Sequence, residues 1–428
     1  MTARYRASSI PGGLFASAFL LLGGARCVGQ SWDVFNMASN GYPSNTVRAI
    51  AHDSAGGTWV GTDWGLCHFD GLTWEVLQVG SGLPENDVRA LACDGQGRVW
   101  IGMFTQGLVI KDGMTWTQYL PGTSPMPGEQ VRNITFDHQG FAWLSTTNGL
   151  ARTDLTDWRI YNDTDTSFNN LELPGVNIAD VAVREDGLVC IGTLNAGFTY
   201  LTDTMVRFYN TFNDFLPDNT ALGVAIDSQG DRWAACPAGA LLRFTAGYND
   251  GLFFQYSTVL SNIPTNALTD IVIDANDRKF IATQNAGLTI LDALNGNWTT
   301  YNEQNSDLPD DELNCVSLAP DGSIWIGTMT GGAARFSPMS GVATPSRNAL
   351  VLKAWPNPFN DRVRIEGNKL DGAYVWRLSD GLGRTVQRGE GRGSGGPLHH
   401  NISGLAPGTY IFTLATGDLR GTIMLLCQ

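Results

Sequence analysis

Short runs in which apolar residues alternate with small or polar ones recur along most of the chain. One group of such runs comprises residues 88–92, 99–101, 108–110 and 116–119, and similar groups follow at intervals of about 40 to 50 residues. Alternation over a few residues, bounded by Gly and Asp, is typical of β-strands rather than helices. The pattern therefore predicts a repeated unit of four short strands.

The spacing between a proline and a tryptophan gives the number of these units. Seven times along the chain, a proline lies 16 residues before a Trp or before a residue that replaces it. The pairs are Pro43 and Trp59, Pro84 and Trp100, Pro127 and Trp143, Pro174 and Cys190, Pro217 and Trp233, Pro264 and Phe280, Pro309 and Trp325. Repetition at this period is a signature of a β-propeller, so we predict seven blades.

The first strand of each unit has the composition of a strand buried on both faces. One position holds a large apolar residue in every unit, namely Ile50, Leu91, Ile134, Val181, Val224, Ile271 and Val316. Smaller residues stand beside it, among them Ala49, Ala90, Gly223 and Cys315. Adjacent sheets interdigitate when large residues face small ones, so we place this strand on the inside, and the residue at the Trp position between blades.

A turn signal joins the first two strands of the units. An aspartate lies six residues before the Trp position at Asp53, Asp94, Asp137, Asp227 and Asp274, and a glycine lies three before it at Gly56, Gly97, Gly140, Gly187, Gly230 and Gly322. We interpret both as turn formers, because Asp bonds its own backbone and Gly accepts positive φ. The alternative role for the aspartates is metal binding or acid–base chemistry, which their repetition at a turn disfavours.

The two ends of the repeat region complement each other. Most units end in an aromatic or apolar residue, two spacers and a Tyr, as in residues 158–161 and 298–301, but the seventh unit ends near Pro338 without this strand. The sequence of residues 32–36 is similar to that of residues 158–162. We therefore predict that the N-terminal strand completes the last blade and closes the ring, which removes two exposed sheet edges.

Charge and cysteine spacing narrow the classes of partner. The chain of 428 residues has 27 Lys and Arg against 41 Asp and Glu, a formal net charge of −14. This acidity disfavours binding to nucleic acid or to an anionic membrane surface. No CxxC spacing links Cys67, Cys93, Cys190, Cys236, Cys315 and Cys427. We expect no metal, no cofactor and buried free thiols.

The N-terminus has the pattern of an export signal. Arg4 and Arg6 precede an apolar stretch at 14–22 and small residues at 23–25, so we interpret residues 1–30 as a signal peptide cleaved near Gly29. The apolar stretch is too short to span a bilayer, and we expect no membrane span in the mature chain. A lipoprotein processed at Cys27 is the alternative, which the charged Arg26 disfavours.

Several motifs recur in phase within the repeats. They include Leu83-Pro84, residues 94–97, Trp100-Ile101-Gly102, Gly107-Leu108 and residues 325–328. With them, residues 31–338 resemble the two-component regulator propeller repeat family. The resemblance implies a propeller of the kind that commonly forms the extracytoplasmic sensing part of hybrid sensor kinases, often tied to glycan use. Because no kinase, membrane span or DNA-binding segment follows the repeats, we do not expect signalling through a fused kinase.

The C-terminal part carries different motifs, at residues 355–360, 375–384 and 402–410. They resemble the C-terminal sorting domain of type IX secretion, which implies a small immunoglobulin-like β-sandwich, and the alternation at 410–414 suits one. Residues 423–428 lack the basic residues frequent in that family, so a related tail that is no sorting signal stays an alternative. We predict an all-β chain with a propeller at 31–340, a linker at 341–348 and a sandwich at 349–428.

Candidate binding residues gather on one face of the predicted propeller, where the fourth-to-first and second-to-third connections open. Arg48, Arg89 and Arg132 occupy an equivalent position at the start of the inner strand in three consecutive units. An arc of three guanidinium groups suits carboxylates or sulfates, which each group binds through two hydrogen bonds. The alternative is pairing with neighbouring acids such as Glu85, Asp87 or Glu129.

The same face is expected to hold aromatic and amide side chains. Trp64 and Phe104 lie in corresponding connections of adjacent units, and amides occupy related positions at Gln106, Asn148, Asn195, Gln284 and Asn285. Aromatic rings beside amides suit sugar rings, which present apolar CH faces and hydroxyl edges. The alternative is that these are ordinary exposed aromatic side chains.

The sequence offers little support for catalysis. The five histidines, His52, His68, His138, His399 and His400, assemble no base, acid and nucleophile at one place, so we do not expect an enzyme. The segment 162–165 resembles a calcium loop but lacks the central Gly and the distal Glu of one.

We therefore predict a secreted or cell-surface propeller that binds a ligand or partner without catalysis. An acidic glycan on the arginine-bearing face is the sharper version. The C-terminal domain would deliver the protein to the export machinery, and we expect a monomer. Two alternatives stay open, a polysaccharide or lactone lyase acting at the channel mouth, and a protein-docking accessory of the export apparatus or outer surface.

Overall fold

The computed structural model describes most of the repeat region and the larger part of the C-terminal domain. The described residues are 31–162, 173, 175–202, 205–212, 216–246, 253–292, 296–337, 352–355, 359, 362–367, 371–380, 385–394, 398–402, 404–416 and 419–427. The predicted signal peptide, the linker at 341–348 and residues 163–165 of the calcium-like segment lie outside them. The chain divides into two compact units, Met1–Pro338 and Met339–Gln428.

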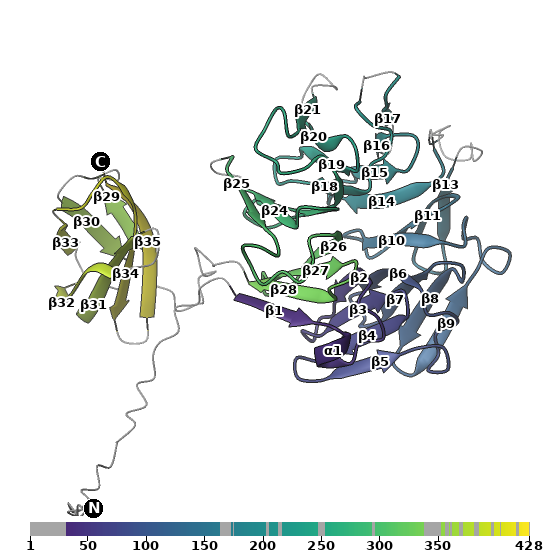
Figure 1. Ribbon diagram of the computed structural model, residues 1–428, viewed down its shortest axis with the longest axis horizontal. Helices are drawn as coiled ribbons and strands as arrows, with labels where there is room; N and C mark the ends of the chain where they lie inside the picture. The colour runs from purple at the N-terminus through teal and green to yellow at the C-terminus, as the bar shows by residue number, and fades with distance from the viewer. Residues whose placement is uncertain are drawn as a thin grey trace, which may run out of the picture. The chain divides into compact units, whose positions relative to one another are not determined.

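Seven antiparallel sheets of four strands surround a common axis in the first unit (Figure 1). We number them blades 1 to 7. Blade 1 comprises β2 (Val47–His52), β3 (Thr58–Thr62), β4 (Gly65–Phe69) and β5 (Trp74–Leu77). Blade 2 comprises β6 (Val88–Cys93), β7 (Val99–Met103), β8 (Leu108–Asp112) and β9 (Thr115–Tyr119). Blade 3 comprises β10 (Val131–Phe136), β11 (Ala142–Thr146), β12 (Gly149–Thr153) and β13 (Trp158–Tyr161).

Blades 4 to 7 follow the same order. Blade 4 comprises β14 (Ile178–Val183), β15 (Val189–Thr193), β16 (Phe198–Leu201) and β17 (Val206–Tyr209). Blade 5 comprises β18 (Gly223–Ile226), β19 (Arg232–Cys236), β20 (Ala240–Phe244) and β21 (Phe253–Tyr256). Blade 6 comprises β22 (Leu268–Ile273), β23 (Lys279–Thr283), β24 (Leu288–Leu291) and β25 (Trp298–Tyr301). Blade 7 comprises β26 (Leu313–Leu318), β27 (Ile324–Thr328), β28 (Ala333–Ser337) and β1 (Ser31–Phe35), and α1 (Met37–Asn40) follows β1.

Strand β1 closes the ring. It pairs antiparallel with β28, with Trp32 opposite Phe336, and the centroids of these two rings are 4.7 Å apart. Blade 7 is thus built from both ends of the repeat region, so the predictions of seven blades and of closure by the N-terminal strand are confirmed. Pairing β1 in this way covers the edge of β28 and gives blade 7 four strands like the other blades.

The core of the propeller lies between neighbouring blades. Trp100 on β7 is 1% exposed and packs with Val131 and Ile134 of the next blade. The seven large inner-strand residues predicted from the sequence are all buried, and adjacent inner strands contact one another. The expected interdigitation of large and small residues is therefore confirmed.

The Asp turns perform the expected role and a second one. Asp94 Oδ1 accepts hydrogen bonds from the backbone N–H groups of Gln96 and Arg98, both at 2.9 Å, as a turn former does. Its Oδ2 accepts a further bond from the indole Nε1 of Trp100. The equivalent aspartate contacts the equivalent Trp in three more blades, for the pairs Asp53 and Trp59, Asp137 and Trp143, Asp227 and Trp233.

The second unit is a small sandwich of two antiparallel sheets. One sheet orders β29 (Leu352–Trp355), β30 (Arg362–Gly367) and β33 (Leu398–Asn401). The other orders β32 (Thr385–Ser394), β31 (Asp371–Asp380), β34 (Gly408–Thr416) and β35 (Leu419–Cys427). Ile365 of the first sheet and Leu378 and Phe412 of the second share one buried cluster, so the sheets pack face to face.

Two further features concern the whole described part of the chain. The cysteines Cys67, Cys93, Cys190, Cys236, Cys315 and Cys427 are all free thiols, with Cys93 and Cys315 only partly buried. No helix among the described residues is long and apolar enough to cross a bilayer.

Candidate ligand-binding face

The three candidate arginines each occupy a β-bulge. In blades 1, 2 and 3 the pairing of the first two strands skips one residue, and these residues are Arg48, Arg89 and Arg132. The same irregularity occurs in blades 4, 6 and 7, where the residues are Ala179, Thr269 and Asn314. A bulged residue leaves the hydrogen-bonded ladder and its side chain is re-aimed. The fold thus repeats one special backbone position around the axis, and three consecutive blades place Arg there.

Arg48 and Arg89 share a single carboxylate. Nη2 of Arg89 lies 2.7 Å from Oδ2 of Asp87, and Nε of Arg48 lies 3.7 Å from Oδ1 of the same side chain. The Nε atoms of both arginines are buried and make no hydrogen bond. The alternative interpretation, pairing with neighbouring acids, therefore applies to Arg48 and Arg89, which both pair with Asp87. One negative charge faces two positive ones, so the pair keeps a net positive charge.

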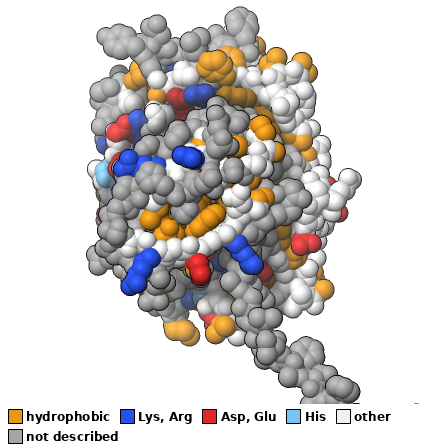
Figure 2. Space-filling view, turned by 90° about the vertical axis from the view of Figure 1, so that its left-hand side faces the viewer, with side chains coloured by type: hydrophobic (Ala, Val, Ile, Leu, Met, Phe, Trp, Pro, Cys, Tyr) orange, Lys and Arg blue, Asp and Glu red, His pale blue; other side chains and the backbone are white. Residues whose placement is uncertain are grey.

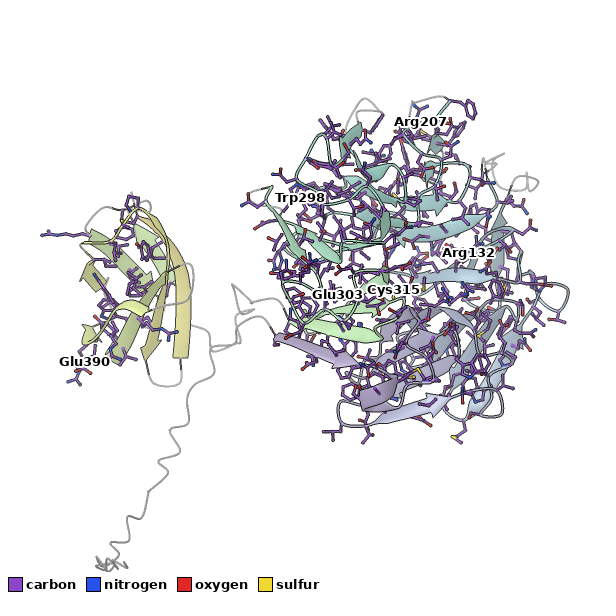
Figure 3. The ribbon with its side chains drawn as sticks, viewed as in Figure 1. Arg132, Arg207, Trp298, Glu303, Cys315 and Glu390 are labelled. Atoms are coloured by element: carbon purple, nitrogen blue, oxygen red, sulfur yellow. The ribbon has the colours of Figure 1, made fainter. Side chains whose placement is uncertain are left out.

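Arg132 is held by amide oxygens. Its guanidinium donates from Nη1 to Oδ1 of Asn177 in blade 4 and from Nη2 to Oε1 of Gln130, the latter at 2.9 Å. Burial, and then the positive charge of Arg89, lower the pKa of Arg132 below its ordinary value. Amide oxygens carry no formal charge, so they orient this guanidinium without neutralising it. Figure 3 shows Arg132 on β10, one of the innermost strands.

The arginines that contact the Asp turns have a different environment. At the Asp turns, guanidinium groups lie 2.5 to 2.7 Å from a carboxylate oxygen in the pairs Arg98 and Asp94, Arg152 and Asp137, Arg243 and Asp231, Arg278 and Asp274. Residues 30–338 contain 14 Lys and Arg against 35 Asp and Glu. On so acidic a propeller, three Arg at one repeated backbone position are unusual, and we call the group of Arg48, Arg89 and Arg132 the arginine arc.

Phe104 lies beside the arginine arc. Its side chain is 43% exposed, and the guanidinium carbon of Arg89 lies 4.4 Å from the centroid of its ring. This distance is that of a cation–π contact, which orients the guanidinium and leaves one face of the ring accessible. Trp64 occupies the corresponding connection of blade 1 and is 60% exposed.

Two of the candidate amides, Gln106 and Asn148, are bonded within their own blades. Oε1 of Gln106 accepts from Nε2 of Gln118 at 3.1 Å, and Nδ2 of Asn148 donates to the carbonyl oxygen of Pro127 at 3.1 Å. These bonds brace the connections on which the two residues lie. The structure thus brings Arg48, Arg89 and Phe104 around Asp87, whereas Gln106 is bonded to Gln118 of β9 and Asn148 to the connection that contains Pro127.

Sequence reasoning missed two acids on the inner strands. Asp180 is buried and Asp270 is partly buried, and both lie at the position held by Ala49 in blade 1. Each carboxylate accepts one bond from its own blade and one from the next blade, the latter from the N–H groups of Val224 at 2.7 Å and Val316 at 2.9 Å. Burial, and then the charge of Asp270, raise the pKa of Asp180 to about 8. The available signal was an Asp at a position otherwise held by small residues.

Two histidines of the propeller, His52 and His68, interact with residues of blade 1. Nδ1 of His52 contacts Oγ1 of Thr58 at 3.2 Å, and burial lowers its pKa to about 4. His68 stacks on Trp59 and contacts Asp53 Oδ2 at 3.2 Å through Nε2. Within the described ranges, no three His, Cys, Asp or Glu side chains are grouped so that they could hold a metal ion.

Two family models match parts of the chain. Residues 353–425 match the secretion system C-terminal sorting domain, and residues 41–64 and 82–105 match the two component regulator propeller. The search of the curated proteins returned no match.

Solved structures resemble the whole fold at low sequence identity. The extracellular domain of a hybrid two component system from B. thetaiotaomicron is 19% identical with a TM-score of 0.61, and the match covers 92% of this chain and 57% of that one. PorZ, a surface component of the type-IX secretion system of Porphyromonas gingivalis, is 16% identical with a TM-score of 0.57, covering 92% and 61%. This chain therefore spans less than two thirds of the length of either protein.

A third similarity is confined to the propeller. YCF48, in a structure with a D1 peptide bound, is 15% identical with a TM-score of 0.52, and the match covers 71% of this chain and 96% of that one. At these identities the structural matches establish the fold. The sorting-domain match places the protein at the cell surface or in the extracellular space. The chain thus consists of a seven-bladed propeller with two component regulator propeller repeats, followed by a secretion system C-terminal sorting domain.

Proposed function

We propose that this protein is a non-catalytic binding protein of the cell surface or extracellular space, which recognises an acidic glycan at the arginine arc. The observation that carries the proposal is the charge balance there. Among the described residues, Asp87 is the one carboxylate in ion-pair contact with these three guanidinium groups, and it contacts Arg48 and Arg89. Positive charge that is positioned and incompletely neutralised favours an anionic ligand.

The chemistry of the arc suits a sugar that carries a carboxylate or sulfate group. A guanidinium binds such a group through two parallel hydrogen bonds, and the side chains of Arg48 and Arg89 are each about a quarter exposed. The exposed ring of Phe104 lies against Arg89 and offers an apolar surface to the CH face of a sugar. Anion and sugar ring would then be held by adjacent groups.

The partners of the described histidines and of the inner-strand acids support a role in binding rather than in catalysis. His52 and His68 contact residues of blade 1, and Asp180 and Asp270 accept hydrogen bonds from backbone N–H groups with both oxygens. A catalytic site needs an acid, a base and a bound substrate within hydrogen-bond reach of one another. The arginine arc supplies charge and shape without a group of that kind.

Calorimetry with uronate-containing, sulfated and neutral polysaccharides tests the proposal. We expect binding of an acidic polysaccharide that weakens as ionic strength rises, and a loss of at least about tenfold in affinity for Arg89→Ala and for Arg132→Met, since each removes a charge-assisted contact. Arg98→Ala is the matched control, because Arg98 is paired with Asp94 at the other end of the blade. Binding unchanged in the arc variants would rule out this face, and release of an unsaturated product from a uronate polymer would instead support a lyase.

A protein partner is the second candidate, and exposed apolar side chains favour it. Val79, Phe212, Val259 and Leu260 lie in connections between the outer strand of one blade and the inner strand of the next, and all are more than half exposed. Such side chains often mark protein contacts. YCF48, which shares the propeller fold, is seen with a peptide bound. Crosslinking on intact cells, followed by purification of this protein, separates a protein partner from a glycan.

A further inference from the structure

The two units of the chain have opposite charge. Residues 339–428 contain 10 Lys and Arg against 6 Asp and Glu, whereas residues 30–338 contain 14 against 35. An acidic surface is therefore repelled by the propeller and attracted by the C-terminal unit. This contrast gives a partner with many carboxylates a physical means of selecting the C-terminal unit of the exported chain.

Two arginines of the C-terminal unit lie directly opposite each other. Arg377 on β31 pairs in register with Arg388 on β32, and both side chains are exposed. The next residue on β31, Leu378, is buried in the core, so Arg377 stands on the opposite, outer face of the sheet. Like charges directly opposite each other on neighbouring strands are destabilising. Their placement is explained more readily by a ligand than by the stability of the sheet.

The arginine pair borders a groove. A hollow of about 430 Å³ is lined by Arg377, Val386, Gln387 and Arg388. The pairing of β31 with β32 shifts between Leu378 and Ser379, which makes Val386 a bulged residue, and this side chain is 40% exposed. Bulges re-aim side chains and are frequent beside binding sites. The groove therefore combines two guanidinium groups with an exposed apolar side chain.

With the groove arginines included, the charged side chains described in this part of β31 and β32 are three Arg and one Glu. Arg392 is exposed two register positions along β32 from Glu390, and Val375, opposite Glu390, is 56% exposed. Glu390, labelled in Figure 3, is the one acid among the described side chains of this part of β31 and β32. Figure 2 shows Lys and Arg side chains at several points of the exposed surface, together with hydrophobic ones.

We infer that the groove between Arg377 and Arg388 is a docking surface for an acidic protein segment of the export machinery. The two guanidinium groups would bind carboxylates of Asp or Glu side chains, and Val386 and Val375, on either side of the arginine pair, would each contact an apolar residue of the segment. The charge contrast within the chain argues for a carboxylate-rich segment, because such a segment gains nothing from the acidic propeller. The inference concerns the sorting domain and is independent of the arginine arc.

Export of the full-length protein by cells with a type IX secretion system tests the inference. We expect Arg377→Glu and Arg388→Glu each to reduce the fraction of protein that reaches the surface or medium by at least about tenfold, because a reversed charge repels an acidic segment. Arg362→Glu is the matched control, since Arg362 is exposed on β30 of the other sheet. Near-normal export of both groove variants, or an equal loss in the control, would overturn the inference.

A binding measurement tests the same inference with the purified chain, outside cells. The probe is poly-L-glutamate, added to the full-length chain carrying Arg89→Ala and Arg132→Ala so that the arginine arc contributes little. We expect Arg377→Gln with Arg388→Gln to weaken binding at least about tenfold and to reduce its salt dependence, while thermal unfolding of the sandwich stays unchanged. Equal affinity with and without the groove arginines would contradict an acidic partner at this surface.

Discussion

The indole Nε1 of Trp100 donates a hydrogen bond of 2.9 Å to Oδ2 of Asp94, six residues earlier in the chain. Trp100 packs between blades 2 and 3, whereas Asp94 forms the turn between β6 and β7. The bond thus couples a local turn to the interface between blades. Because the equivalent bond recurs in blades 1, 3 and 5, the turn and the interface are joined at least four times around the ring.

We expect Asp94→Ala to lower the free energy of unfolding by about 2 to 3 kcal/mol, because it leaves the buried indole N–H and two backbone N–H groups without their acceptor. Unfolding in urea, followed by Trp fluorescence, measures the loss. The control is Asp186→Ala in the corresponding turn of blade 4, where the side chain is 57% exposed and pairs with Arg184. That change is expected to cost less than about 1 kcal/mol. Equal losses would show that the contact with Trp100 contributes nothing.

The buried acid Asp180 predicts a pH dependence of stability. Its pKa in the folded protein is raised to about 8 by burial and by Asp270, so the folded chain holds this proton more tightly than the unfolded chain does. The resulting stabilisation is complete below the ordinary Asp pKa and is lost as the pH rises through about 8. We therefore expect the urea midpoint to decrease as the pH is raised from about 5 to about 8. Asp180→Asn should make this decrease smaller.

Asp186→Asn serves as the control for the pH experiment. Hydrogen bonding with Arg184 lowers the pKa of Asp186 to about 2, so its titration lies below the measured range. The urea midpoint of Asp186→Asn should therefore change with pH as steeply as that of the wild-type protein. A slope that Asp180→Asn leaves as steep as before would contradict the role of the buried acid.

Closure of the ring predicts a specific sensitivity to protease. Trp32 on β1 packs against Phe336 and Tyr301, and β1 is the strand of blade 7 that no hairpin joins to its neighbour. We expect Trp32→Ala to cost about 2 kcal/mol and to expose β1 to limited proteolysis. Trp158→Ala is the control, because Trp158 lies on β13, which follows β12 directly in its own blade. Cleavage at the same rate in both variants would contradict a weakly held closing strand.

Close packing around Gly102 predicts that a larger residue at this position lowers stability. A Cβ atom on Gly102 would lie 2.7 Å from Cβ of Ala90 and 2.8 Å from the carbonyl oxygen of Val131 in the next blade. We expect Gly102→Ala to lower stability by about 1 to 3 kcal/mol, because overpacking displaces the backbone. Gly95 has nothing within 4 Å of such an atom, so Gly95→Ala is the control and should be close to neutral. Denaturant unfolding of the two variants distinguishes crowding from a general effect of Ala.

The structure also shows which parts of the candidate site could be predicted from sequence. Arg48, Arg89 and Arg132 were recognisable as equivalent because the repeats align in phase, and Asp87 was recognisable as a nearby acid. The cation–π contact of Arg89 with Phe104 and the bond of Arg132 to Asn177 of the next blade were not recognisable. Both depend on how the side chains settle after neighbouring connections meet, which local spacing does not encode.

The sequence by itself determined the number of blades, the order of strands and the closure by β1, because these follow from local alternation, turn residues and a repeat that the chain states seven times. Tertiary structure decided the rest. The bulges that carry the arginines, the enclosure of Asp180 beside Asp270, and the opposition of Arg377 to Arg388 all arise from pairing between strands. Charge and burial at such places depend on residues brought together by folding, and no local pattern records those distances.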